Sequence, residues 1–302
     1  MIYLRLDGRI GNQLFMYAFA KCISKKRNNE LIVIDDKEAI KRDYHNSLMD
    51  YDIDNVQYVH DHKMLYSKEF IKQNLIFFFY RVIRKKMGFN KRLSFEKSFQ
   101  KFFNKNGLIL CENGYLDYMI PSTKNILING YFQSDKYFRE VHDEIIDTFT
   151  VDYETMKNCY PDIVKIRNRN SVCISIKVQH NVGNSMYDVC NDGYWQEAID
   201  YICKNVENPL FFICSDNVEY VKNNLIDCSK YDVVYQDSRI PVNVSLSIMS
   251  QCKNFVIGNT TFGWWAQYLC DYDKKIVVAP SRWMKIDMPI DIYQEGWHLV
   301  EV

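Results

Sequence analysis

Short apolar runs alternate with longer amphipathic runs along much of this chain. Near its start, residues 2–6 form an apolar run, residues 12–26 carry apolar positions at helical spacing, and residues 31–34 are apolar again. This order predicts a strand, a helix and a second strand, which together make a βαβ unit.

The alternation becomes regular after Ser171. Runs typical of strands cover residues 172–178, 210–214, 233–235, 254–257 and 275–279. Helical patterns cover residues 194–204, 217–225, 244–251 and 261–270. Strands separated by helices of about ten residues favour a parallel, doubly wound sheet. We therefore expect an α/β fold with two Rossmann-like domains, residues 1–165 and 166–302.

Residues 36–125 follow no clear period, but residues 75–86 (LIFFFYRVIRKK) join an aromatic block to a basic end. Two interpretations stay open for this segment, from Leu75 to Lys86: a core helix with a solvated end, or an anchor on an anionic membrane surface. No apolar run approaches the roughly 20 residues that span a bilayer. Arg5 and Asp7 interrupt the opening run, which is not typical of a signal peptide. We expect a cytoplasmic protein, peripheral on the inner face of the membrane if the second interpretation holds.

Composition narrows the expected partners and cofactors. The 302 residues contain 38 Lys and Arg against 38 Asp and Glu. The protein therefore has no net positive charge that would attract a polyanion, and nucleic acid is not expected as a partner. Ten cysteines without a C-x-x-C pair favour buried free thiols over zinc or disulfides. His60-Asp61-His62 is the one close histidine pair, and a solvated loop is favoured there over a metal ligand. We expect no metal.

Three turns that follow predicted strands are candidate ligand sites, because ligands of open α/β sheets bind beyond the carboxyl ends of strands. Residues 7–13 (DGRIGNQ) place two glycines before a helix, which suits a sharp turn close to an anion. Residues 214–217 (CSDN) end a strand, where Ser215 or Asp216 either binds a ligand or caps the next helix. Residues 257–265 (IGNTTFGWW) either hold a phosphate at a helix start or form an N-cap before two packed tryptophans.

These turns resemble blocks of the bacterial α-1,2-fucosyltransferases, glycosyltransferase family 11. Gly8-Arg-Ile-Gly-Asn-Gln-Leu-Phe-Met-Tyr-Ala18 is similar to the family's opening Gly-Gly-Leu-Gly-Asn-Gln-Met-Phe-Gln-Tyr-Ala, and its Gly-Arg-x-Gly-Asn-Gln form also resembles protein O-fucosyltransferases. Further blocks follow in the family's order: Gly130-Tyr-Phe-Gln-Ser-Asp-Lys-Tyr-Phe138, Phe212-Ile-Cys-Ser-Asp-Asn217, Met249-Ser-Gln-Cys-Lys253, Asn259-Thr-Thr-Phe-Gly-Trp-Trp265 and Ala279-Pro-Ser-Arg-Trp283. The resemblance implies a GT-B fold whose domains face a cleft, a GDP-sugar held mainly by the C-terminal half, an acceptor glycan held mainly by the N-terminal half, and no metal requirement.

One block departs from the family. The family carries His-x-Arg-Arg-x-Asp after the strand that is predicted here at 172–178, and its first Arg neutralises the leaving pyrophosphate. Aligning the strands puts Lys177, Gln179, His180 and Val182 at the His, first Arg, second Arg and Asp positions. The main phosphate cation is therefore missing. Arg9, His180 and Lys177, which strand alternation would place on the same face as Gln179, are the candidates to replace it.

Taken with the resemblance, these residues predict an inverting glycosyltransferase that moves L-fucose from GDP-fucose to a hydroxyl of a surface glycan or oligosaccharide. The hydroxyl expected as acceptor is O2 of galactose. The alternatives are the same fold with another nucleotide sugar, or a catalytically silent glycan- or nucleotide-binding relative. Asp7, Arg9 and Lys177 are assigned to catalysis; Asp7 is the candidate base, with a structural role at the strand end as the alternative. Donor binding is assigned to Asn12, Gln179, His180, Ser215, Asp216, Asn259, Thr260 and Thr261.

Overall fold

The computed structural model describes residues 1–35, 44–60, 67–179 and 181–302. The chain forms two compact units, Met1–Thr148 with Asp287–Tyr293, and Phe149–Ile286 with Gln294–Val302. The predicted boundary at residue 165 falls within α7 (Ile163–Asn168), which, like α6 (Tyr153–Cys159), belongs to the second unit.

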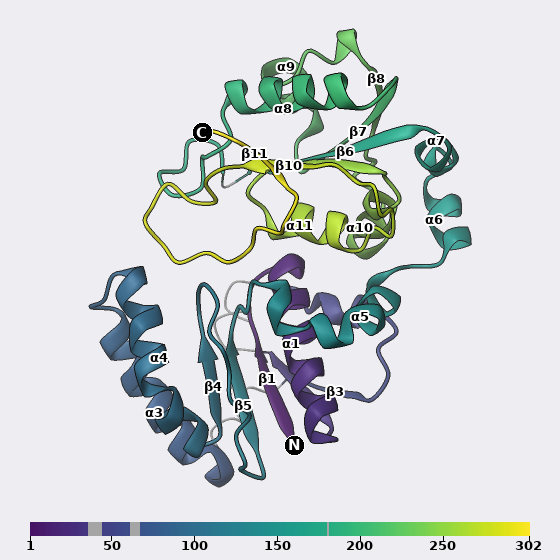
Figure 1. The fold of residues 1–302 in the computed structure, drawn as a ribbon. Coiled ribbons are helices and arrows are strands. Elements are labelled where there is room, and N and C mark those ends of the chain that lie inside the picture. The colour runs from purple at the N-terminus through teal and green to yellow at the C-terminus, as the bar shows by residue number, and fades with distance from the viewer. Residues whose placement is uncertain (36–43, 61–66, 180) are drawn as a thin grey trace. The chain divides into compact units, whose positions relative to one another are not determined.

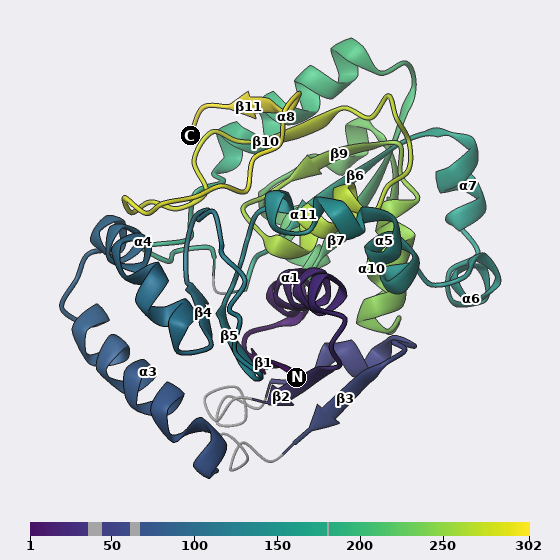
Figure 2. The same ribbon diagram turned by 60° about the horizontal axis from the view of Figure 1, so that its bottom comes forward.

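The first unit is built on a parallel sheet with strand order β3-β2-β1-β5-β4. Its strands are β1 (Ile2–Leu6), β2 (Leu31–Asp35), β3 (Val56–Val59), β4 (Leu108–Cys111) and β5 (Ile126–Gly130). Helix α1 (Ile10–Arg27) covers one face of this sheet, and α3 (Ile71–Arg84) and α4 (Phe89–Lys105) cover the other (Figure 1 and Figure 2). Strands β1 and β5 are adjacent and parallel, so the loops that follow them lie at one edge of the sheet, where ligands of parallel sheets bind.

All five residues of β1 are buried in the core of the first unit. This burial explains why the sequence of the strand is almost continuously apolar. Tyr3 joins Phe70 and Phe77 in an aromatic core on the α3–α4 side, with the Tyr3 and Phe70 rings edge to face. Arg5 is 7% exposed, and its guanidinium carbon lies 4.5 Å from the centre of the Phe77 ring. A cation–π contact thus accommodates the one charge inside this strand.

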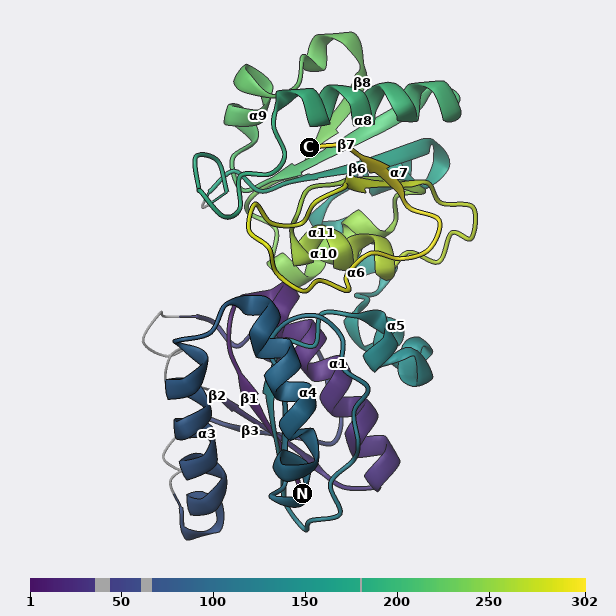
Figure 3. The same cartoon turned by 60° about the vertical axis from the view of Figure 1, so that its left-hand side comes forward.

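The second unit has a six-stranded parallel sheet in the order β11-β10-β9-β6-β7-β8. Its strands are β6 (Asn170–Ile176), β7 (Pro209–Ser215), β8 (Asp232–Tyr235), β9 (Asn254–Ile257), β10 (Val277–Pro280) and β11 (His298–Val300). Helices α8 (Asp192–Asn205) and α9 (Val218–Asn224) lie on one face of it, and α10 (Val242–Ser250) and α11 (Thr261–Tyr268) on the other (Figure 1 and Figure 3). Helix α5 (His142–Phe149) leads from one unit into the other.

Most predicted elements are confirmed within a few residues, including β1, α1, β2, and the alternation from β6 to β10. Strands β3, β4, β5 and β11 have no counterpart in the prediction. All ten cysteines are free, as expected, and six are buried, but Cys159 and Cys203 are exposed. Among the described helices, none combines the length and the apolar character needed to cross a bilayer.

Candidate functional site

A pocket opens at the carboxyl ends of β6 and β9 in the second unit. These neighbouring strands form the switch point of this sheet, because β7 and β8 continue the order on one side of them and β10 and β11 on the other. The pocket draws its lining from loops that follow several elements: Ile176, Lys177, Asn181, Val182, Tyr187, Asp188, Val189, Cys190, Trp195, Leu225, Gly258, Asn259 and Thr260. Three of the predicted site residues, Lys177, Asn259 and Thr260, therefore come together here.

Asp216, directly after β7, organises the loop that follows β6. Its carboxylate accepts the Val178 backbone N–H at 2.8 Å and the Gln179 N–H at 3.2 Å. The Lys177 ammonium lies 2.9 Å from the same carboxylate, and both side chains are largely shielded from solvent. One carboxylate thus binds two main-chain donors and one cation.

This arrangement corrects the strand predicted over 172–178. The strand ends at Ile176, because the N–H groups of Val178 and Gln179 point to Asp216 instead of to a neighbouring strand. Strand alternation therefore says nothing about Lys177 and Gln179, which lie beyond the strand. Gln179 is exposed and is not part of the pocket lining.

The cap of α9 also differs from the prediction. The Asn217 side chain accepts the Tyr220 N–H at 3.0 Å, so Asn217 is the N-cap. Ser215 accepts the Asn217 N–H at 3.1 Å and Asp216 holds the β6 loop, so neither caps the helix. Both lie outside the pocket lining.

Asn259 is a junction between loops of the second unit. Its amide nitrogen donates to the carbonyls of Tyr187 at 3.0 Å and Trp283 at 2.9 Å. Its oxygen accepts from the Asn181 amide at 3.3 Å. Asn259 is 7% exposed and is one of the residues that line the pocket. Its hydrogen bonds join the loops that form the pocket walls.

Thr260 caps α11 by accepting the Gly263 N–H at 3.1 Å, so the N-cap given as one alternative for this turn is present, while phosphate binding there stays a prediction. Thr261 begins the helix and is half-buried. A side chain at Gly263 would have its Cβ 2.8 Å from the Ser175 hydroxyl oxygen, so glycine lets α11 pack directly on β6. Trp264 and Trp265 are fully buried and serve in packing, as expected.

Trp195 is a pocket residue that sequence reasoning missed. It lies on α8 and is 2% exposed, and its indole nitrogen is buried with no hydrogen-bond partner among the described residues. The absence of a side chain at Gly258 makes room for the indole ring, whose edge would lie 3.2 Å from a Cβ there. An unpaired buried N–H costs about 1–3 kcal/mol, so this donor is suited to an acceptor on a ligand. No local pattern marks it, because a tryptophan on an amphipathic helix is indistinguishable from core.

The first unit gathers a second group of predicted residues at the ends of β1 and β5. Gly8 has φ +81° and donates its N–H to the Asp7 carboxylate at 2.7 Å. The Gln13 amide donates to the carbonyls of Gly8 and His45, each at 2.8 Å, and its oxygen accepts the Ser47 N–H at 2.8 Å. Gln13 is 1% exposed, so the glutamine of the opening block holds the turn that presents Asp7.

Asn12 and Arg9 lie at the turn that follows β1, next to Asp7 and Gly8. The Asn12 oxygen accepts from the Gln133 amide at 2.9 Å, and the Tyr131 hydroxyl lies 3.5 Å from the second Asp7 oxygen. Arg9 is the N-cap residue of α1 and is exposed. The opening block and the Gly130–Phe138 block, far apart in sequence, are therefore in contact.

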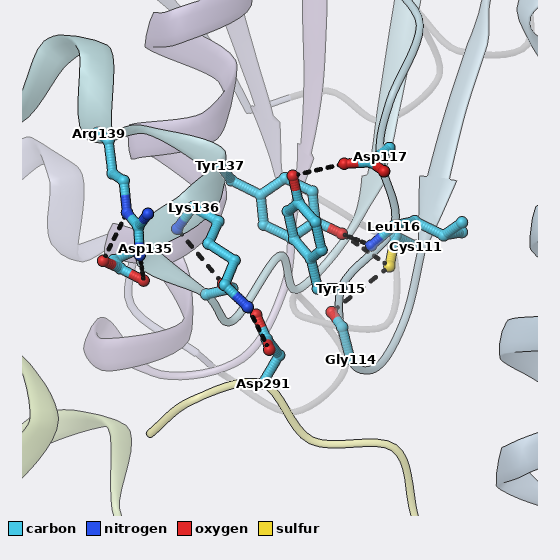
Figure 4. A network of polar contacts seen from close by, with 11 residues as sticks. Cys111, Gly114, Tyr115, Leu116, Asp117, Asp135, Lys136, Tyr137, Arg139 and Asp291 are labelled. Atoms are coloured by element: carbon cyan, nitrogen blue, oxygen red, sulfur yellow. Dashed lines mark hydrogen bonds and ion pairs between the residues drawn. The ribbon is translucent and has the colours of Figure 1, made fainter. Parts of the chain in front are cut away.

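A polar network anchors the remainder of the Gly130–Phe138 block (Figure 4). The Tyr137 hydroxyl accepts the Leu116 N–H at 2.9 Å and lies 3.2 Å from the Cys111 sulfur, and burial raises the pKa of Tyr137. Lys136 Nζ lies 2.8 Å from Asp291, and the Ser134 hydroxyl donates to the same carboxylate at 2.6 Å. The segment Asp287–Tyr293, late in the chain, is thus tied into the first unit.

Two predicted positions fall on residues the structure does not describe. His180, a candidate cation, lies outside the described residues, as does His62. His60 Nδ1 lies 2.7 Å from Asp35. In the described part of the chain, no three His, Cys, Asp or Glu residues gather as a metal would require.

Two units with parallel sheets, each with polar residues beyond the carboxyl ends of its strands, are the two Rossmann-like domains of the GT-B class of folds. A crystal structure of NodZ alpha-1,6-fucosyltransferase soaked with GDP-fucose has the same fold, at a TM-score of 0.54 and 12% identity over 95% of this chain and 99% of that one. The family model described as glycosyl transferase family 11 matches residues 1–301, and the chain belongs to this family of glycosyltransferases.

Two relatives that match over their full length, and one that matches over about a third of it, agree with this assignment. An alpha-1,2-colitosyltransferase of Escherichia coli is 27% identical over all of this chain and 99% of its own length. The O-antigen biosynthesis glycosyltransferase WbnK of Escherichia coli is 23% identical over 98% of this chain and 99% of its own. A galactoside alpha-(1,2)-fucosyltransferase 1 of Ateles belzebuth is 30% identical over 36% of this chain and 31% of its own.

Proposed function

We propose that this protein transfers L-fucose from GDP-fucose to a glycan hydroxyl, galactose O2 of a surface glycan, with inversion at the sugar carbon. The observation that carries the proposal is the pocket at the β6–β9 switch point, which collects Lys177, Asn259, Thr260 and the unpaired Trp195 N–H. Lys177 supplies a cationic donor, and Thr260 and Trp195 supply neutral donors suited to the phosphate oxygens of a sugar diphosphate, while Asn259 holds the walls of the pocket. The relatives that span the whole chain support a sugar acceptor by their names, an alpha-1,2-glycosyltransferase and an O-antigen enzyme.

In the proposed step, the acceptor oxygen forms a bond to C1 of the sugar as the bond from C1 to the β-phosphate oxygen breaks. GDP leaves with the electron pair, and the acceptor proton passes to a base, for which Asp7 is our candidate. Negative charge grows on the departing phosphate, so fixed positive charge there lowers the barrier. No metal enters this scheme; the phosphates are assigned to side chains and helix N–H groups.

We assign the phosphate cation to Lys177, with Arg9 as the second candidate. Lys177 lines the pocket, and its ion pair with Asp216 holds the ammonium in one place while Gln179 supplies no charge. The proposed role of Asp216 is therefore to position Lys177 and the loop behind it. The donor contacts assigned to Ser215, Thr261, Asn12 and Gln179 stay predictions. The cytoplasmic location stays a prediction as well.

Transfer of colitose from GDP-colitose is the second candidate. It is favoured by the similarity to an alpha-1,2-colitosyltransferase over the full length of both chains. Both candidates share the fold, the leaving group and the proposed pocket.

The test is a transfer assay with purified protein, radiolabelled GDP-fucose or GDP-colitose, and galactose-terminated oligosaccharides. Product from GDP-fucose with an α-1,2 linkage supports the first candidate, and product only from GDP-colitose replaces it with the second. GDP binding measured by calorimetry without transfer from either donor would leave a silent nucleotide-binding relative and refute both.

A further inference from the structure

Helix α3 carries an apolar stripe on its outer side. Large apolar side chains at spacings of one, three and four residues are exposed by 39–60%: Ile71, Leu75, Phe78, Phe79, Val82 and Ile83. This spacing puts them along one side of the helix from its first turn to its last. Nothing in the described part of the chain covers these side chains. We call this set the α3 stripe.

The opposite side of α3 already fulfils the role of a core helix. Phe77 and Tyr80 are 7% and 4% exposed and belong to the aromatic core above the sheet. The Tyr80 ring also packs edge to face with Phe103 of α4, and α3 and α4 run side by side in Figure 3. The residues of the α3 stripe therefore lie outside this core. A contiguous exposed apolar surface of this kind marks an interaction site.

The charges on α3 and α4 themselves are almost all of one sign, and Glu112, from the segment after β4, pairs with Arg84 and Arg92. From Ile71 to Lys105 the chain has ten Lys and Arg residues and a single acidic residue, Glu96, although the whole chain is neutral. Glu96 is 1% exposed and accepts a hydrogen bond from Tyr80, so it contributes no surface charge. Lys72, Lys85 and Lys86 are exposed at the two ends of the stripe.

We propose that the α3 stripe docks on an anionic lipid bilayer, with α3 lying in the plane of the interface. An apolar face flanked by lysines is the pattern of helices that insert their apolar side chains among lipids while the ammonium groups meet anionic headgroups. A second copy is disfavoured as the occupant, because it would bring two surfaces of the same positive sign together. The outer side of a single helix is also convex. A flat bilayer can contact such a side along the whole helix, whereas a peptide would need a groove to bind in. This docking does not depend on which sugar is transferred.

Co-flotation with vesicles tests the proposal without any activity measurement. The full chain is mixed with vesicles of equal parts phosphatidylglycerol and phosphatidylcholine, or of phosphatidylcholine alone. We expect co-flotation with the anionic vesicles at 50 mM salt, a partition coefficient at least 10-fold lower on neutral vesicles, and a marked loss at 500 mM salt.

Two variants separate the apolar and the electrostatic contributions. Phe78→Ser with Phe79→Ser should lower partitioning by at least 10-fold, because two large apolar side chains no longer enter the bilayer. Lys85→Glu with Lys86→Glu should lower it by about 25-fold or more, at roughly 5-fold for each basic residue lost near an anionic surface. The matched control is Val242→Ser in the second unit, a side chain that is 53% exposed and should leave partitioning unchanged.

Because the substituted side chains are exposed, each variant should keep the melting temperature of the parent, which is measured alongside. The proposal is overturned if the parent fails to float with anionic vesicles at low salt, or if the phenylalanine variant floats as well as the Val242→Ser control. It is also overturned if sedimentation shows a concentration-dependent dimer that this variant abolishes, or if the stripe binds an acidic protein and no vesicles.

Discussion

Replacing Lys177 by alanine tests the proposed charge compensation most directly. In the parent, the Lys177 ammonium lies 2.9 Å from Asp216 at the edge of the pocket, while the family's arginine position holds the neutral Gln179. The variant removes the one Lys or Arg side chain among the described residues that line the pocket. It also leaves the Asp216 carboxylate with only main-chain donors, so its negative charge is no longer balanced by the Lys177 ammonium.

The size of the effect follows from the contact. A charge-assisted interaction contributes about 1.5–3 kcal/mol, which corresponds to a factor of roughly 10 to 150 in kcat/KM. The ion pair with Asp216 offsets part of the Lys177 charge, and the side chains are 27% and 22% exposed, so solvent screens the pair only in part. We expect kcat/KM to fall by about 10- to 100-fold, mainly through kcat, because the phosphate charge is largest in the transition state.

The assay is steady-state transfer from the preferred GDP-sugar, with Lys222→Ala as the matched control. Lys222 lies in the same unit, 2.9 Å from Glu219 in an ion pair of the same length, but away from the pocket lining. Adding Gln179→Arg to Lys177→Ala should restore part of the rate if the guanidinium reaches the same oxygens. If Lys177→Ala is as active as Lys222→Ala, Lys177 is not the phosphate cation, and Arg9→Ala becomes the variant to test.

Four further outcomes are expected. Trp195→Phe keeps the packing but loses the unpaired N–H, so calorimetry should give a GDP-sugar Kd raised by roughly 2- to 12-fold; an unchanged Kd would remove Trp195 from the site. Burial raises the pKa of Glu96 to about 7 from its ordinary 4.5, so the folded state binds the extra proton between these values and stability falls as pH rises through this window. Urea unfolding from pH 5 to 8 should show this loss, about 3 kcal/mol, in the parent and not in Glu96→Gln; parallel curves would contradict it. Gly263→Ala forces a Cβ against Ser175 and should lower the free energy of unfolding by about 1–3 kcal/mol, whereas Gly88→Ala, with no atom within 4 Å of the added carbon, should change it little. Finally, transfer should persist in EDTA, and a loss that manganese restores would contradict the metal-free scheme.

The sequence by itself determined the class of the fold and the family. Continuous apolar runs such as β1 and β6 are buried on both faces, so their pattern is strong, and the helices between them have clear periods. The motif blocks mark turns that need particular residues locally, such as Gly8 with its positive φ and Thr260 as an N-cap. Such local requirements are written in neighbouring residues and can be read without the fold.

Weak or short elements escaped prediction for a physical reason. Strand β3 is half-exposed and β11 has three residues, so neither has an apolar run that differs from a loop. The helices α3 and α4 are rich in aromatic residues on more than one side, which blurs the helical period. Tertiary contacts decided these segments.

Only the tertiary structure decided what the site residues do. The end of β6 at Ile176 depends on a carboxylate that arrives from β7, and the same contact makes Asp216 a partner of Lys177. Trp195 becomes a pocket residue because Gly258, on a different element, leaves room for its ring. These outcomes rest on groups brought together across tens of residues, and a hydrogen bond or an ion pair at that separation leaves no periodic trace in the sequence.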